Sequence, residues 1–228
     1  MSKIKEVIVD KFPYLFIFYN LFIKHKIFIK KSYYSDSGED KFIMSQFKKK
    51  RGFYVDVGCH HPTRINNCHL LYLNNWRGIN IDINKISIEM FKIARKEDIN
   101  LHSAVSLKEK YVNFFYDKPL SLYNSLIKSK DLKFHKIVKS QKLTTLINKT
   151  KYKNKKIDFL SVDTEGKDLE VLKSLDFVIY KPKYICVEIW GEEKIKNFNL
   201  KKNSTYKFLI KKKYKLVFSN KENYIFKF

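Results

Sequence analysis

Residues 52–62 read Gly-Phe-Tyr-Val-Asp-Val-Gly-Cys-His-His-Pro, and residues 76–82 read Trp-Arg-Gly-Ile-Asn-Ile-Asp. Each stretch holds a short run rich in β-branched or aromatic residues, Phe53–Val57 and Gly78–Ile81, as buried parallel strands do. A glycine turn and room for a helix separate the two runs, and the second run ends in an acid, Asp82. This layout predicts neighbouring strands of a parallel sheet, with a nucleotide-type ligand at their carboxyl ends.

The turn after the first predicted strand narrows the class of cofactor. Gly58 permits a tight turn and a close approach of the backbone to a ligand. Asp82 follows at about the spacing of a ribose-binding acid. However, Cys59, His60 and His61 fill the loop, so the full G-x-G-x-x-G is absent and a dinucleotide with its pyrophosphate is disfavoured. A cofactor with a ribose and no phosphate, such as S-adenosylmethionine, fits better.

The composition fits one folded domain. The chain has 228 residues, of which 44% are hydrophobic and 16% aromatic, enough for one sizeable core and too many for a disordered chain. The formal net charge is +24, but nearly all of it comes from lysine. Because RNA binders and sequence-specific readers rely on arginine, the charge alone does not indicate a nucleic-acid partner. Non-specific attraction to polyanions at low salt is expected.

The cysteines indicate the compartment. Cys59, Cys68 and Cys186 are an odd number without C-x-x-C spacing. This pattern argues against a disulfide framework or a structural zinc site, and it favours a reducing, cytoplasmic compartment.

The apolar stretch Phe12–Ile23 lies in a segment, residues 1–34, that we separate from the main domain at residues 35–228. The stretch is shorter than the ~20 residues that span a bilayer, and no signal-peptide cleavage site follows it. We expect a helix packed on the domain or on a partner. The alternative is a helix peripheral to the inner face of the membrane, with contact through residues 12–31, because lysines follow the aromatic residues. These lysines are Lys24, Lys26, Lys30 and Lys31.

Strand and helix patterns alternate along the rest of the chain, which predicts a three-layer, Rossmann-like α/β fold with a mostly parallel sheet. Asp117–Lys156 is lysine-rich and poorly patterned, so we expect a helix or two there and a role facing the substrate. A C-terminal antiparallel hairpin is expected at Tyr214–Phe218 and Tyr224–Phe228. Further strands are expected near Ile99–Val105, Tyr111–Tyr116, Ile157–Asp163 and Tyr184–Ile189. Helices are expected after Ser37, which would be an N-cap, around Met90 and at Asp168–Leu175. Another helix is expected to place Leu70, Leu71 and Leu73 on its inner side.

Three acids stand at the carboxyl ends of predicted central strands: Asp56, Asp82 and Asp163. We expect Asp82 to accept hydrogen bonds from both ribose hydroxyls. Asp56 is expected to order the Gly58 loop and to contact the amino-acid end of the cofactor. Any one of these acids alone would be read as an ordinary strand-end polar residue, but the three together with Gly58 favour a ligand site.

The stretch Asp163-Thr-Glu-Gly166 carries the candidate chemistry. We expect Asp163 to face the methyl donor and to deprotonate or orient an acceptor hydroxyl. Glu165 has three equally weighted interpretations: a base, a charge at the start of the next helix, or a ligand in a divalent-metal site with Asp163 and Glu188. His60 and His61 are alternative bases, because imidazole titrates near neutrality.

Together these motifs resemble the FkbM-type S-adenosylmethionine-dependent methyltransferases. The resemblance spans roughly Ser35 to Ile189 and implies a class I methyltransferase fold. It also implies O-methylation of a hydroxyl on a sugar or natural product, as in glycan biosynthesis. It rests on Ser37–Asp40, Asp56–Cys68, Trp76–Asp82, Arg95–Asn100 and Phe159–Leu172. Beside Asp56, Gly58 and Asp82, it places cofactor contacts at Cys59, Asn67, Ile83, Ser103 and Ala104.

The chain departs from the family pattern at Asn66-Asn67-Cys68, where Ser-Asn-Thr is common, and this change bears on the cofactor or acceptor pocket. Arg64, Arg95 and Asp98 match the pattern and are interpreted as a structural ion pair. Two alternatives to a glycan methyltransferase stay open. One is an RNA methyltransferase that grips its substrate through Asp117–Lys156. The other is an inactive interaction subunit that docks through the N-terminal segment.

Overall fold

The structure is a computed structural model that describes residues 11–48, 51–121, 124–126, 128, 130–132, 134–189, 198–220 and 222–228. Of the predicted N-terminal segment, residues 1–10 lie outside this part, as do residues 122–123, 127, 129 and 133 of the lysine-rich segment.

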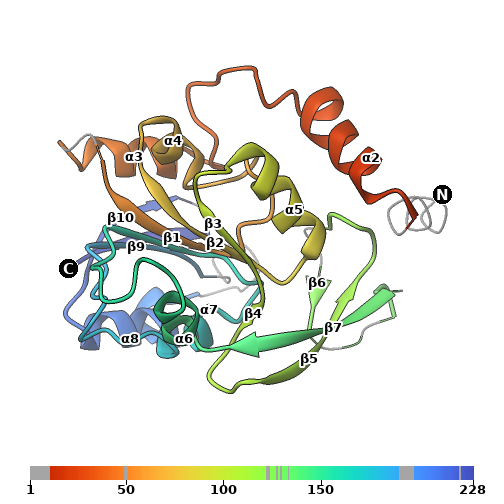
Figure 1. Cartoon of the computed structure of the whole chain (residues 1–228). Coiled ribbons are helices and arrows are strands. Elements are labelled where there is room, and N and C mark those ends of the chain that lie inside the picture. Colours follow the sequence, from red (N-terminus) through yellow and green to blue (C-terminus); the bar gives the residue numbers. More distant parts are fainter. Residues whose placement is uncertain are drawn as a thin grey trace.

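Within the described residues, the central sheet has seven strands in the order β10-β11-β9-β8-β1-β2-β3 (Figure 1). The pairings from β9 through β8, β1 and β2 to β3 are parallel, and the C-terminal hairpin adds two antiparallel strands beside β9. The predicted α/β fold with a mostly parallel sheet and a closing hairpin is therefore confirmed. The strands are β1 (Phe53–Val57), β2 (Arg77–Asp82), β3 (Ile99–His102), β8 (Phe159–Val162), β9 (Tyr184–Glu188), β10 (Lys215–Asn220) and β11 (Asn223–Lys227).

Helices cover both faces of this sheet, which gives three layers (Figure 1). Side chains alternate between the faces along a strand. On β1, Phe53, Val55 and Val57 pack in the core on the side of α6, α7 and α8, whereas Tyr54 packs on the side of α3 and α4. Every residue of β1 is buried, which explains why all of them except Asp56 are apolar or aromatic. The helices are α3 (Glu39–Ser45), α4 (His69–Leu73), α5 (Lys85–Ala94), α6 (Leu143–Asn148), α7 (Asp168–Lys173) and α8 (Ser204–Lys211).

A second sheet has four strands in the described part of the chain, in the order β4-β7-β5-β6. The antiparallel addition expected at Tyr111–Tyr116 is confirmed, because β5 pairs antiparallel with β7. The helix expected in Asp117–Lys156 is confirmed as α6, but the segment also contains β6 and β7, which the sequence did not predict. Few of the β7 side chains are buried, so its strand pattern is weak in the sequence. The strands are β4 (Ala104–Val105), β5 (Lys110–Tyr116), β6 (Asn124–Ser125) and β7 (Phe134–Gln141).

In the described part of the N-terminal segment, residues 13–24 are helical and pack on the domain, as expected. Helix α2 (Pro13–Phe18) continues into a π-helical turn at Tyr19–Lys24. Ile17 of α2 and Leu21 of the π-helical turn form a small core with Met90 of α5. No helix in the described ranges is long and apolar enough to cross a membrane.

Two local expectations are corrected. Helix α3 follows Gly38, which is the N-cap with a left-handed φ of 89°, so Ser37 is not the cap. The Ser35 hydroxyl instead accepts hydrogen bonds from the backbone N–H groups of Gly38 (3.0 Å) and Asp40 (3.4 Å). Leu73 is 46% exposed rather than inward-facing, because it is the last residue of a short helix.

Candidate functional site

The carboxyl ends of β8, β1 and β2 lie side by side, because β1 pairs with both other strands. After β3 the chain returns to the opposite side of β1, so β1 and β8 flank the point where the strand order reverses. Open α/β sheets bind their ligands at such a point. A cavity of about 320 Å³ lies there, within the size range of small-molecule sites.

Gly58 is required by the close approach of two strand ends. Its φ is +78°, and a Cβ atom at this position would stand 1.7 Å from the carbonyl oxygen of Asp163. The Asp163 N–H donates to the Val57 carbonyl (3.0 Å), and the Gly58 N–H donates to the Ile81 carbonyl (2.9 Å). The glycine therefore joins the ends of β1, β2 and β8 into one cavity wall, and the close approach that it permits is to the Asp163 backbone.

Asp82 shapes the adjoining wall. Its carboxylate accepts hydrogen bonds from the backbone N–H groups of His60 and Asn84, both at 2.7 Å. Burial raises the pKa of Asp82 to about 6, against the opposing effect of these two bonds. Because each carboxylate oxygen has two lone pairs, capacity remains for the hydroxyl groups of a ribose.

Asp163 stands on the opposite side of the cavity, beyond the end of β1. Because β1 lies between β8 and β2, these two strands are two strand spacings apart, about 10 Å. Burial raises the pKa of Asp163 well above its usual value, and the nearby carboxylates Glu188, Asp168, Glu165 and Asp56 raise it further. In its ionised form a carboxylate with a raised pKa is a stronger base than an ordinary carboxylate, and such shifts are concentrated at functional sites.

The turn after Asp163 is held by Asp168. One oxygen of Asp168 accepts hydrogen bonds from the Thr164 N–H (3.0 Å) and hydroxyl (3.3 Å), and burial raises its pKa to about 6. Glu165 and Gly166 both have left-handed φ angles, of 52° and 84°. Glu165 lines the cavity and precedes α7, whose first turn instead carries Asp168 and Glu170.

The carboxylates do not form the metal site that the sequence suggested. Among the described residues, no group of three or more His, Cys, Asp or Glu side chains could hold a metal ion. Asp163, Glu165 and Glu188 are thus neighbours that raise a pKa rather than a ligand set.

The two adjacent histidines take different positions. His60 lines the cavity with a left-handed φ of 50°, whereas His61 is buried outside it and packs against the His25 ring (4.8 Å between ring centroids). Burial lowers the pKa of His60 to about 4 and that of His61 to about 2. Both rings are therefore neutral at neutral pH and are weak bases, and only His60 faces the cavity.

Some of the remaining predicted cofactor contacts line the cavity, and others lie outside it. Ile83, Ser103 and Ala104 line the cavity. Cys59 packs with Ile88 and Phe91 outside it. Its carbonyl accepts a hydrogen bond from Asn66, which orders the Gly58 loop from behind.

Asp56 and Asn67 also lie outside the lining of the cavity. Asp56 is buried and accepts a hydrogen bond from Asn66 Nδ2 (2.9 Å), so it contributes to the order of the loop. Asn67 Nδ2 donates to the Ser161 hydroxyl (3.2 Å) on β8. The departure from the family pattern at residues 66–68 therefore lies behind the cavity rather than in its wall.

Several lining residues were not identified from the sequence. Asn84 caps α5, and its Oδ1 accepts a hydrogen bond from the Ile86 N–H (3.0 Å), so the cap signature Asn-x-Ile was the available signal. Ser121 and Leu126 come from the lysine-rich segment. That segment was expected to face the substrate, but its pattern singled out no residue.

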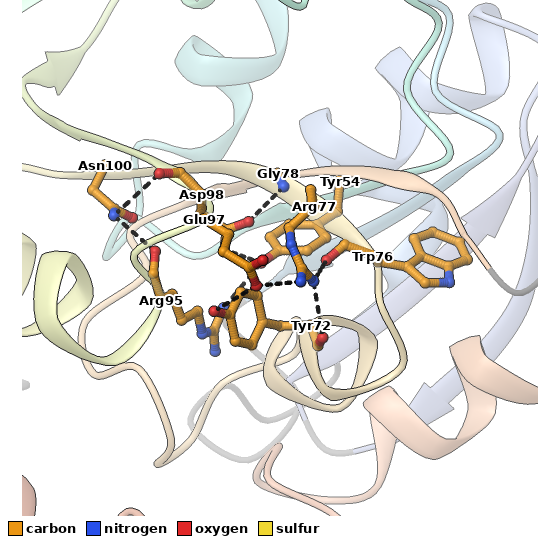
Figure 2. Close-up of polar contacts among 9 residues, drawn as sticks. All are labelled: Tyr54, Tyr72, Trp76, Arg77, Gly78, Arg95, Glu97, Asp98 and Asn100. Atoms are coloured by element: carbon orange, nitrogen blue, oxygen red, sulfur yellow. Dashed lines mark hydrogen bonds and ion pairs between the residues drawn. The ribbon is translucent and has the colours of Figure 1, made fainter.

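A second buried polar cluster lies toward the amino-terminal side of β2 (Figure 2). Asp98 accepts hydrogen bonds from the Tyr54 hydroxyl, the Gly78 N–H (2.8 Å) and Asn80 Nδ2 (3.1 Å). Burial raises the pKa of Asp98, and the nearby Arg95 guanidinium opposes that rise.

Arg95 is completely buried and connects this cluster to the Gly58 loop. Its guanidinium donates to Asn66 Oδ1 (2.6 Å) and to the Pro62 carbonyl. It also stacks over the Phe91 ring at 4.8 Å. Arg95 and Asp98 belong to one buried network, in which the Tyr54 hydroxyl and the Asn80 side chain each contact both of them. Arg64, which the sequence interpretation placed with them, is exposed.

Comparisons with known proteins agree with this architecture. A model of the methyltransferase FkbM domain matches residues 56–208. No curated protein matches the chain.

Two solved structures are similar at low identity. One is a TehB-like SAM-dependent methyltransferase from Corynebacterium glutamicum ATCC 13032 Kitasato, with 10% identity, 85% of this chain and 88% of that chain covered, and a TM-score of 0.45. The other is the 16S rRNA methylase ArmA, with 14% identity, 82% and 79% covered, and a TM-score of 0.37. Both folds are distant, so the family match carries the weight of the comparison.

Proposed function

Because the chain belongs to the FkbM methyltransferase family and uses S-adenosylmethionine, we propose that its acceptor is a hydroxyl of a sugar, a glycan or a related intermediate. The observation that carries this proposal is Asp163, a carboxylate of raised pKa in the wall of the cavity, across from Asp82.

The cavity fits the cofactor. Asp82 would hold the ribose, and the apolar side chains of Ile83 and Ala104 would lie against the adenine. The backbone of Gly58 lines the same cavity and would contact the amino-acid end, while its missing Cβ makes room for the Asp163 carbonyl. Asp82, the Gly58 backbone and this polar and apolar lining match a ribose-containing ligand without phosphates.

Asp163 acts on the acceptor. When bound, the cofactor supplies an electrophilic methyl group, which forms a bond to the acceptor oxygen as its bond to sulfur breaks. The Asp163 carboxylate takes the proton of the attacking hydroxyl, a role that contributes roughly 10²–10⁴-fold to such reactions. The cavity walls hold the reacting groups in line, and such positioning can supply about 7–11 kcal/mol of the barrier.

The charge around Asp163 supports a neutral acceptor with several hydroxyls. Asp163, Glu165 and Thr164 line this side of the cavity and offer oxygens that accept hydrogen bonds from hydroxyl groups. The same carboxylates repel a phosphate, and Lys167 in the lining offsets only part of that charge. RNA is therefore the less suitable acceptor, although lysines on the second sheet are exposed.

The test begins with titration calorimetry of S-adenosylmethionine into the purified chain. Binding is expected, with a loss of tenfold or more in Asp82→Ala and a smaller loss in Asp82→Asn, which keeps one acceptor oxygen. Transfer of a labelled methyl group is then measured with a panel of sugars and with RNA. Methylation of RNA alone, falling steeply with added salt, would overturn the proposed acceptor and favour the RNA alternative.

A further inference from the structure

The N-terminal helix has one side buried and one side exposed. On the inner side, Ile17 and Leu21 are fully buried against α5. On the outer side, the large apolar and aromatic side chains are about half to two-thirds exposed, and Figure 1 shows α2 as the outermost element beside α5. These outer residues are Phe12, Leu15, Phe18, Tyr19 and Ile23. Tyr14 is exposed as well, but it also lines a cavity on the side of the second sheet.

The chain that follows extends this surface. Phe28, Ile29 and Tyr33 are exposed as well, Phe28 by 68%. Residues 11–34 contain five lysines and no Asp or Glu. All five lysines are exposed: Lys11, Lys24, Lys26, Lys30 and Lys31. We call the exposed apolar residues of 12–33 together with these lysines the N-terminal face.

We propose that the N-terminal face docks on an anionic membrane surface, with α2 lying in the plane of the interface. The mixture of exposed aromatic and aliphatic side chains with lysines is the chemistry of interfacial helices. Acidic lipids complement a segment that carries five positive charges and no negative one. A protein partner would need a surface that is both apolar and acidic over the same stretch. The test must distinguish such a partner from a membrane.

Docking would bring the substrate side of the molecule to the lipid. Pro13, Tyr14 and Ile17 form one wall of a second cavity, of about 350 Å³, opposite the second sheet. Ile83 and Asn84 line both this cavity and the cofactor cavity. A methyl acceptor anchored in the membrane would therefore approach from the side of α2, a consequence that rests on the proposed function, whereas docking itself does not.

Sedimentation with vesicles tests docking. The full chain is mixed with phosphatidylcholine vesicles, with or without about 30% phosphatidylserine, and strong binding is expected only with the acidic lipid. The variant Leu15→Ser/Phe18→Ser/Ile23→Ser should bind at least about tenfold more weakly, because these side chains insert between lipids. The variant Lys24→Glu/Lys26→Glu/Lys30→Glu/Lys31→Glu should lose more, since each lysine near the surface contributes about fivefold.

Matched controls separate docking from the attraction of any basic protein to acidic lipid. Val178→Ser/Ile210→Ser/Val217→Ser removes exposed apolar side chains elsewhere, and Lys201→Glu/Lys202→Glu/Lys207→Glu/Lys211→Glu makes the same change in charge on and near α8. Both should bind vesicles within about twofold of the unchanged chain.

Circular dichroism and the unfolding midpoint report whether each variant is folded, independently of cofactor binding. Phe28→Ser, outside the helix, gives a second apolar test if the triple variant unfolds. Equal losses in the face and control variants would overturn the proposal in favour of net charge. No binding to acidic vesicles would also overturn it and would leave a protein partner as the occupant.

Discussion

Two buried aspartates of this molecule stand in opposite surroundings. Asp98 receives hydrogen bonds from Tyr54, Gly78 and Asn80 beside the Arg95 guanidinium. Asp163 has carboxylates as the charged neighbours that most affect its pKa. Burial raises the pKa of both carboxylates, but hydrogen-bond donors and a cation oppose the rise at Asp98, whereas like charges add to it at Asp163. The first environment stabilises the fold, and the second keeps a raised pKa that chemistry can use.

Asp163 lines the cofactor cavity, whereas Asp98 is held by hydrogen bonds within a buried network. The network around Asp98 and Arg95 fills its space and connects α5, β1, β2 and the Gly58 loop. Asp163 instead faces open volume beside Gly58. The Asp98–Arg95 network holds the cavity wall in place. Substitutions in the network should therefore lower stability, whereas a substitution of Asp163 should lower turnover.

The largest effect is expected at Arg95. Arg95→Ala leaves Asp98 buried without its cation, and Asn66 and the Pro62 carbonyl without their donor, at a cost of about 3–5 kcal/mol in the free energy of unfolding. Urea denaturation measures this change. The exposed Arg64→Ala is the matched control and should stay within about 0.5 kcal/mol. Similar values for both variants would show that the network does not stabilise the fold.

Gly58→Ala tests the junction between the two regions. The left-handed φ and the contact with the Asp163 carbonyl together should lower the free energy of unfolding by about 3 kcal/mol and abolish cofactor binding. Gly38 also has a left-handed φ, but its Cβ would meet nothing within 4 Å, so Gly38→Ala should cost only about 1 kcal/mol. Equal costs would mean that the close approach at Gly58 is not limiting.

Asp163→Asn separates chemistry from stability. Turnover should fall by about 10²-fold while the affinity for S-adenosylmethionine and the free energy of unfolding are kept, because the variant removes a repelled charge. Asp98→Asn should do the reverse and weaken the fold. Turnover in the unchanged enzyme should rise with pH as Asp163 loses its proton, and this dependence should be absent in Asp163→Asn. Full turnover in Asp163→Asn would move the base to another residue.

The smallest effect is a pH dependence of stability. Burial raises the pKa of Asp82 to about 6 in the folded chain, so its stabilising contribution is present below about pH 4 and is lost as the pH rises toward 6. His60, whose pKa is lowered to about 4, acts in the opposite direction over the same window. Between pH 4 and pH 6, the free energy of unfolding of the unchanged chain should therefore fall by about 2 kcal/mol relative to that of Asp82→Asn. Parallel pH curves for the two proteins would contradict the raised pKa.

Much of the fold could be predicted because the central strands carry strong local patterns. Phe53–Val57 has the same bounds in the structure as in the sequence prediction, since a strand buried on both faces is mostly apolar, here with Asp56 as the one exception. Phe134–Gln141 was missed because its side chains are mostly exposed, and its pairing with β5 is a long-range contact that no short window reveals.

The candidate site likewise contains residues that local patterns identify and residues that only long-range contacts place. The sequence by itself determined which residues stand at strand ends, so Gly58, Asp82 and Asp163 are identifiable from their positions in the chain, because parallel strands bring their carboxyl ends to one edge. The tertiary structure alone decided where loop side chains point. The left-handed φ of Gly58 and His60 turns His60 toward the cavity and leaves Cys59 and His61 against other parts of the chain. The tertiary structure alone also decided that Asn66 is hydrogen-bonded to both Arg95 and Asp56. The direction of a loop side chain depends on partners that are distant in the sequence.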